Sequence, residues 1–134
     1  MNTPPTSATE EQIAELVRRF YERALQNDSL RPVFEAAVAD WDTHHRLVQD
    51  FWSRTLLDTS RYRGHPYSIH AQLPLRPEHF DIWLGLFRET AREVLPADAA
   101  DKAISRAEHM AESFKAGMFS FPRYEGPKLW KSAL

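Results

Sequence analysis

The sequence predicts an all-α protein of one domain. Apolar residues recur at three- and four-residue steps along most of the chain, which is the spacing of one helix face. No stretch of any length alternates apolar and polar residues, as a half-buried strand would. Prolines stand where a helix can begin or must end, and a chain of 134 residues has the length of a single domain.

The first three helices are expected before residue 58. The stretch from Ser7 to Glu10 resembles a capping box, and the face of the helix that follows carries Ile13, Leu16, Val17, Phe20, Tyr21 and Ala24. Asn27-Asp28-Ser29 ends that helix, and Pro32 can open a short second one. Asp40 or Asp42 can cap the third, whose apolar stripe is Leu47, Val48, Phe51, Trp52, Thr55 and Leu56.

The second half begins with a loop at 58–66. Pro66 can then open a brief helical turn that holds His70 and closes at Pro74. Pro77 opens a long helix with the stripe Phe80, Trp83, Leu84, Phe87, Ala91 and Val94, and Asp98 can cap the last helix. We expect a flexible segment at 1–7, one domain at 8–120 and a loosely ordered tail at 121–134.

Composition excludes several classes of function. The chain has 17 Lys and Arg against 19 Asp and Glu, so there is no basic excess for nucleic acid. It contains no apolar run near the ~20 residues that span a bilayer and no signal peptide, so we expect a cytoplasmic protein that binds no membrane. The absence of cysteine excludes disulfides, thiolate metal sites, iron–sulfur clusters, thiol nucleophiles and covalent c-type haem attachment through Cys-x-x-Cys-His.

Four residues remain as candidates for chemistry. His70 lies between a Gly/Pro turn and a long aromatic-faced helix. This position suits a histidine that binds an iron carried in its own macrocycle. Tyr21, His44 and Trp83 lie on the inward faces of three different helices. Taken singly, each also fits an ordinary role, as a core tyrosine, a partly exposed histidine or a packed indole. His45, one position round the helix from His44, is expected to point elsewhere.

The order and spacing of these residues resemble the truncated haemoglobins, and group III of that family in particular. The resemblance covers about residues 8–120. It rests on Phe20-Tyr21, Asp28-x-Leu30-x-Pro-Val-Phe34, Trp41-x-x-His44, Phe51-Trp52, Tyr62-x-Gly64-x-Pro66-x-x-x-His70, His79-Phe80-x-x-Trp83-Leu-x-Leu-Phe87, and Arg106-Ala107 with Ala111 and Phe114.

The resemblance implies a truncated globin fold, a 2-on-2 helical sandwich around a non-covalent b-type haem with its iron. It makes His70 the proximal iron ligand and places Tyr21, His44 and Trp83 on the distal side. The haem pocket would be formed by Phe20, Phe34, Val48, Phe51, Trp52, Tyr62, Ile69, His79 and Phe80. The stretch from His70 to Trp83 is one residue shorter than the family pattern, which leaves the haem propionate partners open among Arg61, Arg63, Arg76 and His79.

The function implied is binding of oxygen, and of other diatomic gases such as nitric oxide or carbon monoxide. A haem redox enzyme is the alternative, either a nitric oxide dioxygenase or a peroxidase-like protein, and it would need an external reductase. A helical interaction module without haem is a remote third possibility. We expect a monomer or a weak homodimer.

Overall fold

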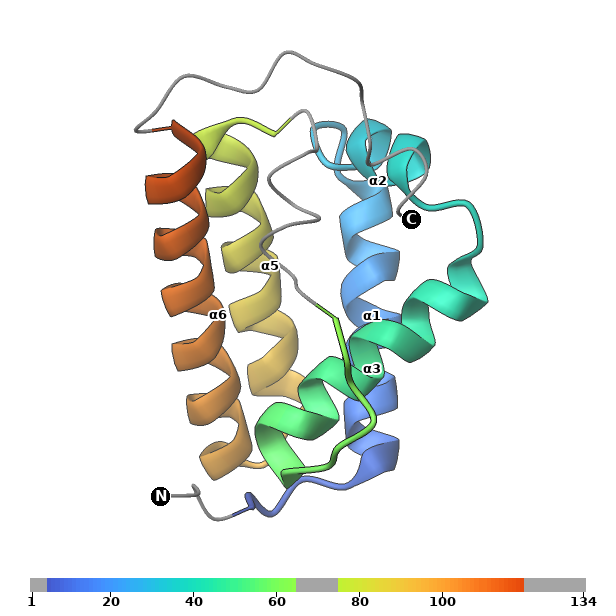
Figure 1. Ribbon diagram of the computed structural model, residues 1–134, viewed down its shortest axis with the longest axis vertical. Coiled ribbons are helices and arrows are strands. Elements are labelled where there is room, and N and C mark those ends of the chain that lie inside the picture. The colour runs from blue at the N-terminus through green and yellow to red at the C-terminus, as the bar shows by residue number, and fades with distance from the viewer. Residues whose placement is uncertain (1–4, 65–74, 120–134) are drawn as a thin grey trace.

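The computed structural model describes residues 5–64 and 75–119. Within these two ranges the chain forms helices and no strand, as the all-α prediction requires (Figure 1). The helices are α1 (Glu10–Gln26), α2 (Arg31–Ala37), α3 (Trp41–Leu57), α5 (Pro77–Val94) and α6 (Ala97–Phe119). The predicted helical turn around His70, the pocket residue Ile69 and the tail from 121 lie outside the described residues.

The long helices form two layers of two. α5 and α6 lie side by side and run in opposite directions, since a two-residue connection joins them. α1 packs against α5 and also against α3, which crosses it obliquely (Figure 1). The short α2 follows α1 at one end of the molecule. None of the described helices has the length and apolar content needed to cross a bilayer.

The ends of two helices differ from the sequence prediction. Thr9, and not Ser7, caps α1: its side chain accepts from the Gln12 amide at 3.1 Å, and the Gln12 side chain accepts from the Thr9 amide at 3.0 Å. Ser7 instead donates its amide to Asp98 at 2.8 Å. Asp98 was predicted to cap α6, but it lies inside the first turn of that helix, which begins at Ala97, and its carboxylate ties the start of the chain to α6.

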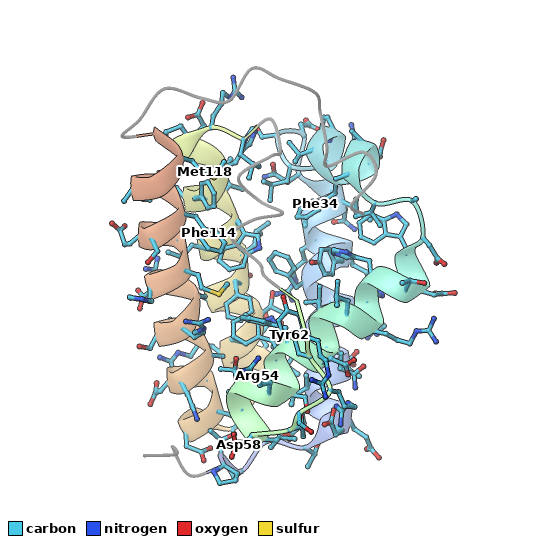
Figure 2. All side chains as sticks on the ribbon, in the orientation of Figure 1. Phe34, Arg54, Asp58, Tyr62, Phe114 and Met118 are labelled. Carbon is cyan, nitrogen blue, oxygen red and sulfur yellow. The ribbon has the colours of Figure 1, made fainter. Side chains whose placement is uncertain are left out.

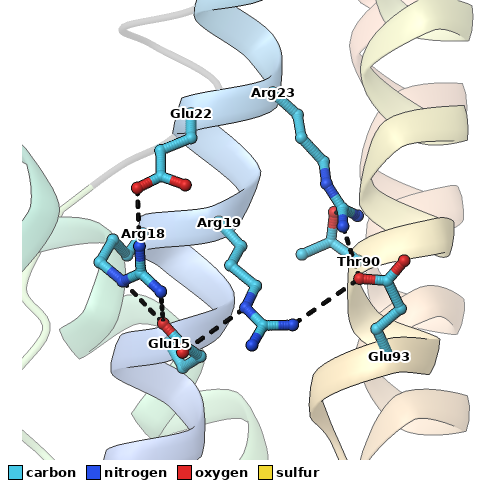
Figure 3. Close-up of polar contacts among 7 residues, drawn as sticks. All are labelled: Glu15, Arg18, Arg19, Glu22, Arg23, Thr90 and Glu93. Atoms are coloured by element: carbon cyan, nitrogen blue, oxygen red, sulfur yellow. Dashed lines mark hydrogen bonds and ion pairs between the residues drawn. The ribbon is translucent and has the colours of Figure 1, made fainter.

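α1 is fixed to α5 by a polar contact on its outer side (Figure 3). The Arg23 guanidinium donates to the hydroxyl of Thr90 at 3.0 Å and pairs with Glu93. Thr90 is fully buried, and its hydroxyl also donates to the Leu86 carbonyl at 2.7 Å, so it acts both as a donor and as an acceptor. The contact sets the position of α1, which carries Tyr21, relative to α5, which carries Trp83.

A second polar cluster fixes the strap that follows α3, residues 58–64. Arg61 of the strap donates to Glu10 at 2.8 Å, to Asp50 at 2.9 Å and to the Ser53 hydroxyl at 2.9 Å. Ser53 has no exposed surface and also meets Thr59 of the strap at 2.8 Å. These bonds hold the strap along α3, so that Tyr62 packs against the ring of Phe51 with centroids 5.2 Å apart.

The hydrophobic core is divided into two clusters. The larger lies among α1, α3, α5 and α6 and includes Ile13, Leu16, Leu56 and Phe87. The smaller one is formed by Ala37, Leu75, Phe80, Met110, Ala111, Phe114 and Met118. Between the two clusters lies a slot that is lined by residues of both.

Candidate functional site

The slot between the two core clusters is a pocket with about 1170 Å³ of open space, counting its opening to solvent. Residues from every described helix and from the strap line it, and Phe34, Tyr62 and Phe114 mark three parts of its wall in Figure 2. Most of the lining is aliphatic or aromatic. The polar side chains that reach it are Tyr21, His44, Tyr62, His79 and Trp83. A largely apolar cavity with a few polar groups is the usual form of a small-molecule or cofactor site.

Most of the residues that the sequence singled out lie around this pocket. Its lining includes Tyr21, Phe34, His44, Val48, Phe51, Trp52, Tyr62, His79, Phe80 and Trp83. Phe20 does not line it, because consecutive residues of a helix point about 100° apart and Phe20 faces the core behind Tyr21. There its ring meets those of Tyr21 at 5.1 Å and Trp83 at 5.9 Å, both edge-on. His70 and Ile69 lie outside the described residues.

Tyr21 and His44 form one polar pair. The Tyr21 hydroxyl lies 2.9 Å from Nε2 of His44, so a hydrogen bond joins α1 to α3 at the pocket wall. Tyr21 is 6% exposed, and burial raises the pKa of its hydroxyl well above the usual range. The phenol therefore keeps its proton at any physiological pH, and Tyr21 can act as a hydrogen-bond donor.

Trp83 contributes a fixed indole to the same region. Its ring stacks on Phe87 with centroids 5.5 Å apart and an interplanar angle of 12°, while the edge of Phe20 meets it at 75°. Phe20 touches both Tyr21 and Trp83. The three predicted distal residues are thus brought together, as a hydrogen-bonded pair and an indole held on the neighbouring helix.

His79 is a buried histidine whose tautomer the backbone determines. Its Nδ1 accepts the amide proton of Arg76 at 3.0 Å, so the neutral ring carries its own proton on Nε2. Burial, with a contribution from the Arg76 charge, lowers the pKa of His79. His79 is therefore a neutral Nε2–H donor at the pocket.

Two of the arginines that the sequence offered, with His79, as possible partners of the haem propionates are in ion pairs. Arg61 pairs with Glu10 and Asp50, and Arg76 pairs with Glu78.

Within the described ranges, no three His, Cys, Asp or Glu side chains gather as ligands for a metal ion. The pocket offers apolar walls and single polar groups instead. These suit a large, mostly apolar ligand better than a bare ion.

Comparison with known proteins agrees with this arrangement. Residues 8–120 match the bacterial-like globins as a family. The chain belongs to the bacterial-like globin family. This globin is 32% identical over 117 residues to the group 3 truncated hemoglobin of Campylobacter jejuni, an alignment that covers 84% of the chain and 92% of that relative. The crystal structure of a group III truncated hemoglobin from Campylobacter jejuni superimposes with a TM-score of 0.79 at 28% identity, covering 91% of this chain and all of that one.

The matches confirm the truncated globin fold and the resemblance to group III. The wall of the globin's pocket opposite α3 was only partly foreseen from the sequence. Leu75, Met110, Ala111 and Phe114 line it, and of these four residues the family resemblance had singled out only Ala111 and Phe114. A stripe of apolar residues indicates that a helix face is buried. It does not indicate whether that face lines a ligand pocket or packs against other side chains.

Tyr62 is held in the pocket wall by a close contact with Gly64. A Cβ atom at Gly64 would overlap the Tyr62 hydroxyl and press on the ring carbon that bears it. Burial raises the pKa of Tyr62, although the charges of Arg54 and Arg106 oppose the shift. The absence of a side chain at Gly64 lets the strap fold back over this tyrosine.

We therefore expect Gly64→Ala to lower the free energy of unfolding of this globin by about 1–3 kcal/mol, the usual cost of overpacking. Gly85→Ala is the matched control, because a Cβ there meets no atom within 4 Å. Alanine at this exposed position in the middle of α5 should stabilise the helix by up to about 1 kcal/mol. Urea unfolding of both variants measures the difference, and equal effects would contradict the contact between Gly64 and Tyr62.

Proposed function

We propose that this globin binds a b-type haem non-covalently in the slot, with His70 as the proximal iron ligand, and takes up oxygen or other diatomic gases there. The observation that carries the proposal is the slot itself. It divides the core in two, its walls are apolar, and Tyr21, His44 and Trp83 meet at one part of it. Membership of the globin family supports the same assignment.

The described side chains fit such a group. A haem presents a broad apolar plate with an apolar edge, and the slot offers aromatic and aliphatic walls from both layers of the fold. Val48, Phe51 and Trp52 of α3 would pack on one side, with Phe80 of α5 and Phe114 of α6 opposite. When bound, haem supplies an iron whose open position takes up small gases.

The distal residues would stabilise a gas that acquires partial negative charge on binding. A hydrogen bond to such a charge contributes about 1–3 kcal/mol when the donor is well aimed and kept from water. Tyr21 is buried and remains protonated, so its hydroxyl can donate whenever His44 supplies the other hydrogen of the pair. Trp83 adds an indole whose plane is fixed by Phe87.

The environment of His70 favours gas binding over strong peroxidase activity. Residues 64–75 contain no carboxylate that could raise the basicity of the imidazole. The second ring nitrogen of His70 would then bond a backbone carbonyl. A proximal histidine without a carboxylate partner leaves the iron less activated.

The test is a haem titration of the purified chain. We expect one haem per chain and a strong, sharp near-ultraviolet absorption band. Ala111→Trp, which places an indole in the slot, should reduce haem uptake. Ala116→Trp, at an exposed position of the same helix, should leave uptake unchanged. A chain that stays colourless with added haem would refute the proposal.

A further inference from the structure

One half-buried histidine has no role in the site described so far. His45 follows His44 on α3 but does not line the pocket. Its Nε2 is buried and has no hydrogen-bond partner among the described residues. An unpaired buried nitrogen lowers stability, so its presence calls for a reason.

The ring of His45 lies on the face of Tyr21. The two centroids are 5.3 Å apart and the planes differ by only 25°. The other aromatic neighbours of Tyr21 approach at steep angles: Phe20 at 79°, Phe34 at 85°, Trp41 at 63° and His44 at 75°. Among these contacts, His45 makes the parallel stack on the phenol.

The position of His45 follows from the geometry of α3. Side chains of consecutive helical residues point about 100° apart, so His44 and His45 cannot meet the same part of Tyr21. His44 reaches the hydroxyl at 2.9 Å, and His45 covers the ring face. Trp41, one turn earlier on α3, meets both imidazoles with centroids 5.6 and 5.8 Å away. Trp41 thus restricts the movement of both rings.

We propose that His45 is a positioning residue for Tyr21, whose stacked imidazole holds the plane of the phenol while His44 holds its hydroxyl. The proposal rests on the function inferred above, in which that hydroxyl faces the bound gas. Rotation of the phenol about its Cβ–Cγ bond leaves the oxygen in place, but it turns the O–H bond, which prefers the plane of the ring, over a wider range of directions. A donor loses much of its effect when it is misaligned.

The stacking contact between His45 and Tyr21 joins two uncharged rings. Burial lowers the pKa of His45, and the charge of Asp42 opposes this shift only in part. Stacking should therefore survive replacement by another flat ring and fail with a branched aliphatic side chain. His45→Phe and His45→Leu are the variants that separate these cases.

The first measurement is the rate at which the Tyr21 ring flips, by NMR of tyrosine-labelled protein under carbon monoxide and reductant. Tyr21→Phe assigns the signal. We expect His45→Leu to speed the flip roughly tenfold or more, because the stack no longer restrains the ring, while His45→Phe should stay close to the parent. His109→Leu, an exposed histidine on α6, is the control and should change nothing.

The second measurement is a double-mutant cycle on the rate of oxygen release. His45→Leu should speed release roughly threefold or more when Tyr21 is present, and have little effect in a Tyr21→Phe background, since coupled residues are not additive. Equal flip rates in the leucine and phenylalanine variants, or an equal effect of His45→Leu in both backgrounds, would overturn the proposal. If the flip rates are as expected but the chain takes up no haem, the proposed function is refuted, while His45 remains the residue that orders Tyr21.

Discussion

Replacing His70 with glycine should abolish stable coordination of haem by this globin. A chain without cysteine offers no thiolate ligand, and neutral imidazole is the usual proximal ligand in globins. The ferrous visible spectrum reports the change directly, because the five-coordinate histidine form is lost when its axial ligand is removed. We also expect the variant to release haem far faster than the parent to a haem-scavenging protein.

Two controls make this experiment specific to His70. His65→Gly removes another histidine from the same segment of the chain and should leave the ferrous spectrum unchanged. Free imidazole added to the His70→Gly protein should restore a histidine-like spectrum, because it can occupy the space of the lost side chain. A normal five-coordinate spectrum in His70→Gly without imidazole would disprove the assignment of the proximal ligand.

Tyr21→Phe should speed oxygen release by roughly ten- to a hundredfold. The substitution keeps the ring and its aromatic neighbours and removes only the hydroxyl that bonds His44 at 2.9 Å. A hydrogen bond to a charged acceptor contributes about 1.5–3 kcal/mol, and every 1.4 kcal/mol is about tenfold in rate or affinity. Flash photolysis or stopped-flow mixing measures the release.

Tyr62→Phe is the matched control for that experiment. Tyr62 also lines the pocket, but its hydroxyl packs against Gly64 of the strap. We therefore expect oxygen release from Tyr62→Phe to stay close to that of the parent. An unchanged rate in Tyr21→Phe would show that the distal hydrogen bond comes from a different residue.

The long helices could be predicted because each is amphipathic over several turns. The stripe through Ile13, Leu16 and Phe20 indicated α1, and Pro77 indicated the start of α5. The cap of α1 was placed at Ser7 instead of Thr9. Both residues can cap a helix, and the bond between Ser7 and Asp98 depends on a helix 91 residues away. A local sequence pattern does not show which distant residue will form a hydrogen bond with a given side chain.

The polar residues of the pocket wall could also be named in advance. Polar residues on apolar stripes stand out in a sequence, and the structure places Tyr21, His44 and Trp83 at the pocket wall. The role of His45 could not be found in this way. It depends on the angle at which α3 crosses α1, which places a ring from one helix on the face of a ring from the other.

The sequence by itself determined the all-α class, the order of the described helices and most of the apolar residues that face inward. It did so because helix periodicity is a local property that tertiary packing rarely reverses over several turns. Only the tertiary structure decided which inward residues line the pocket and which pack on one another, that Gly64 leaves room for the Tyr62 ring, and that His45 stacks on Tyr21. These outcomes depend on distances between segments far apart in the chain, whereas an apolar stripe shows that a face is covered and not what covers it.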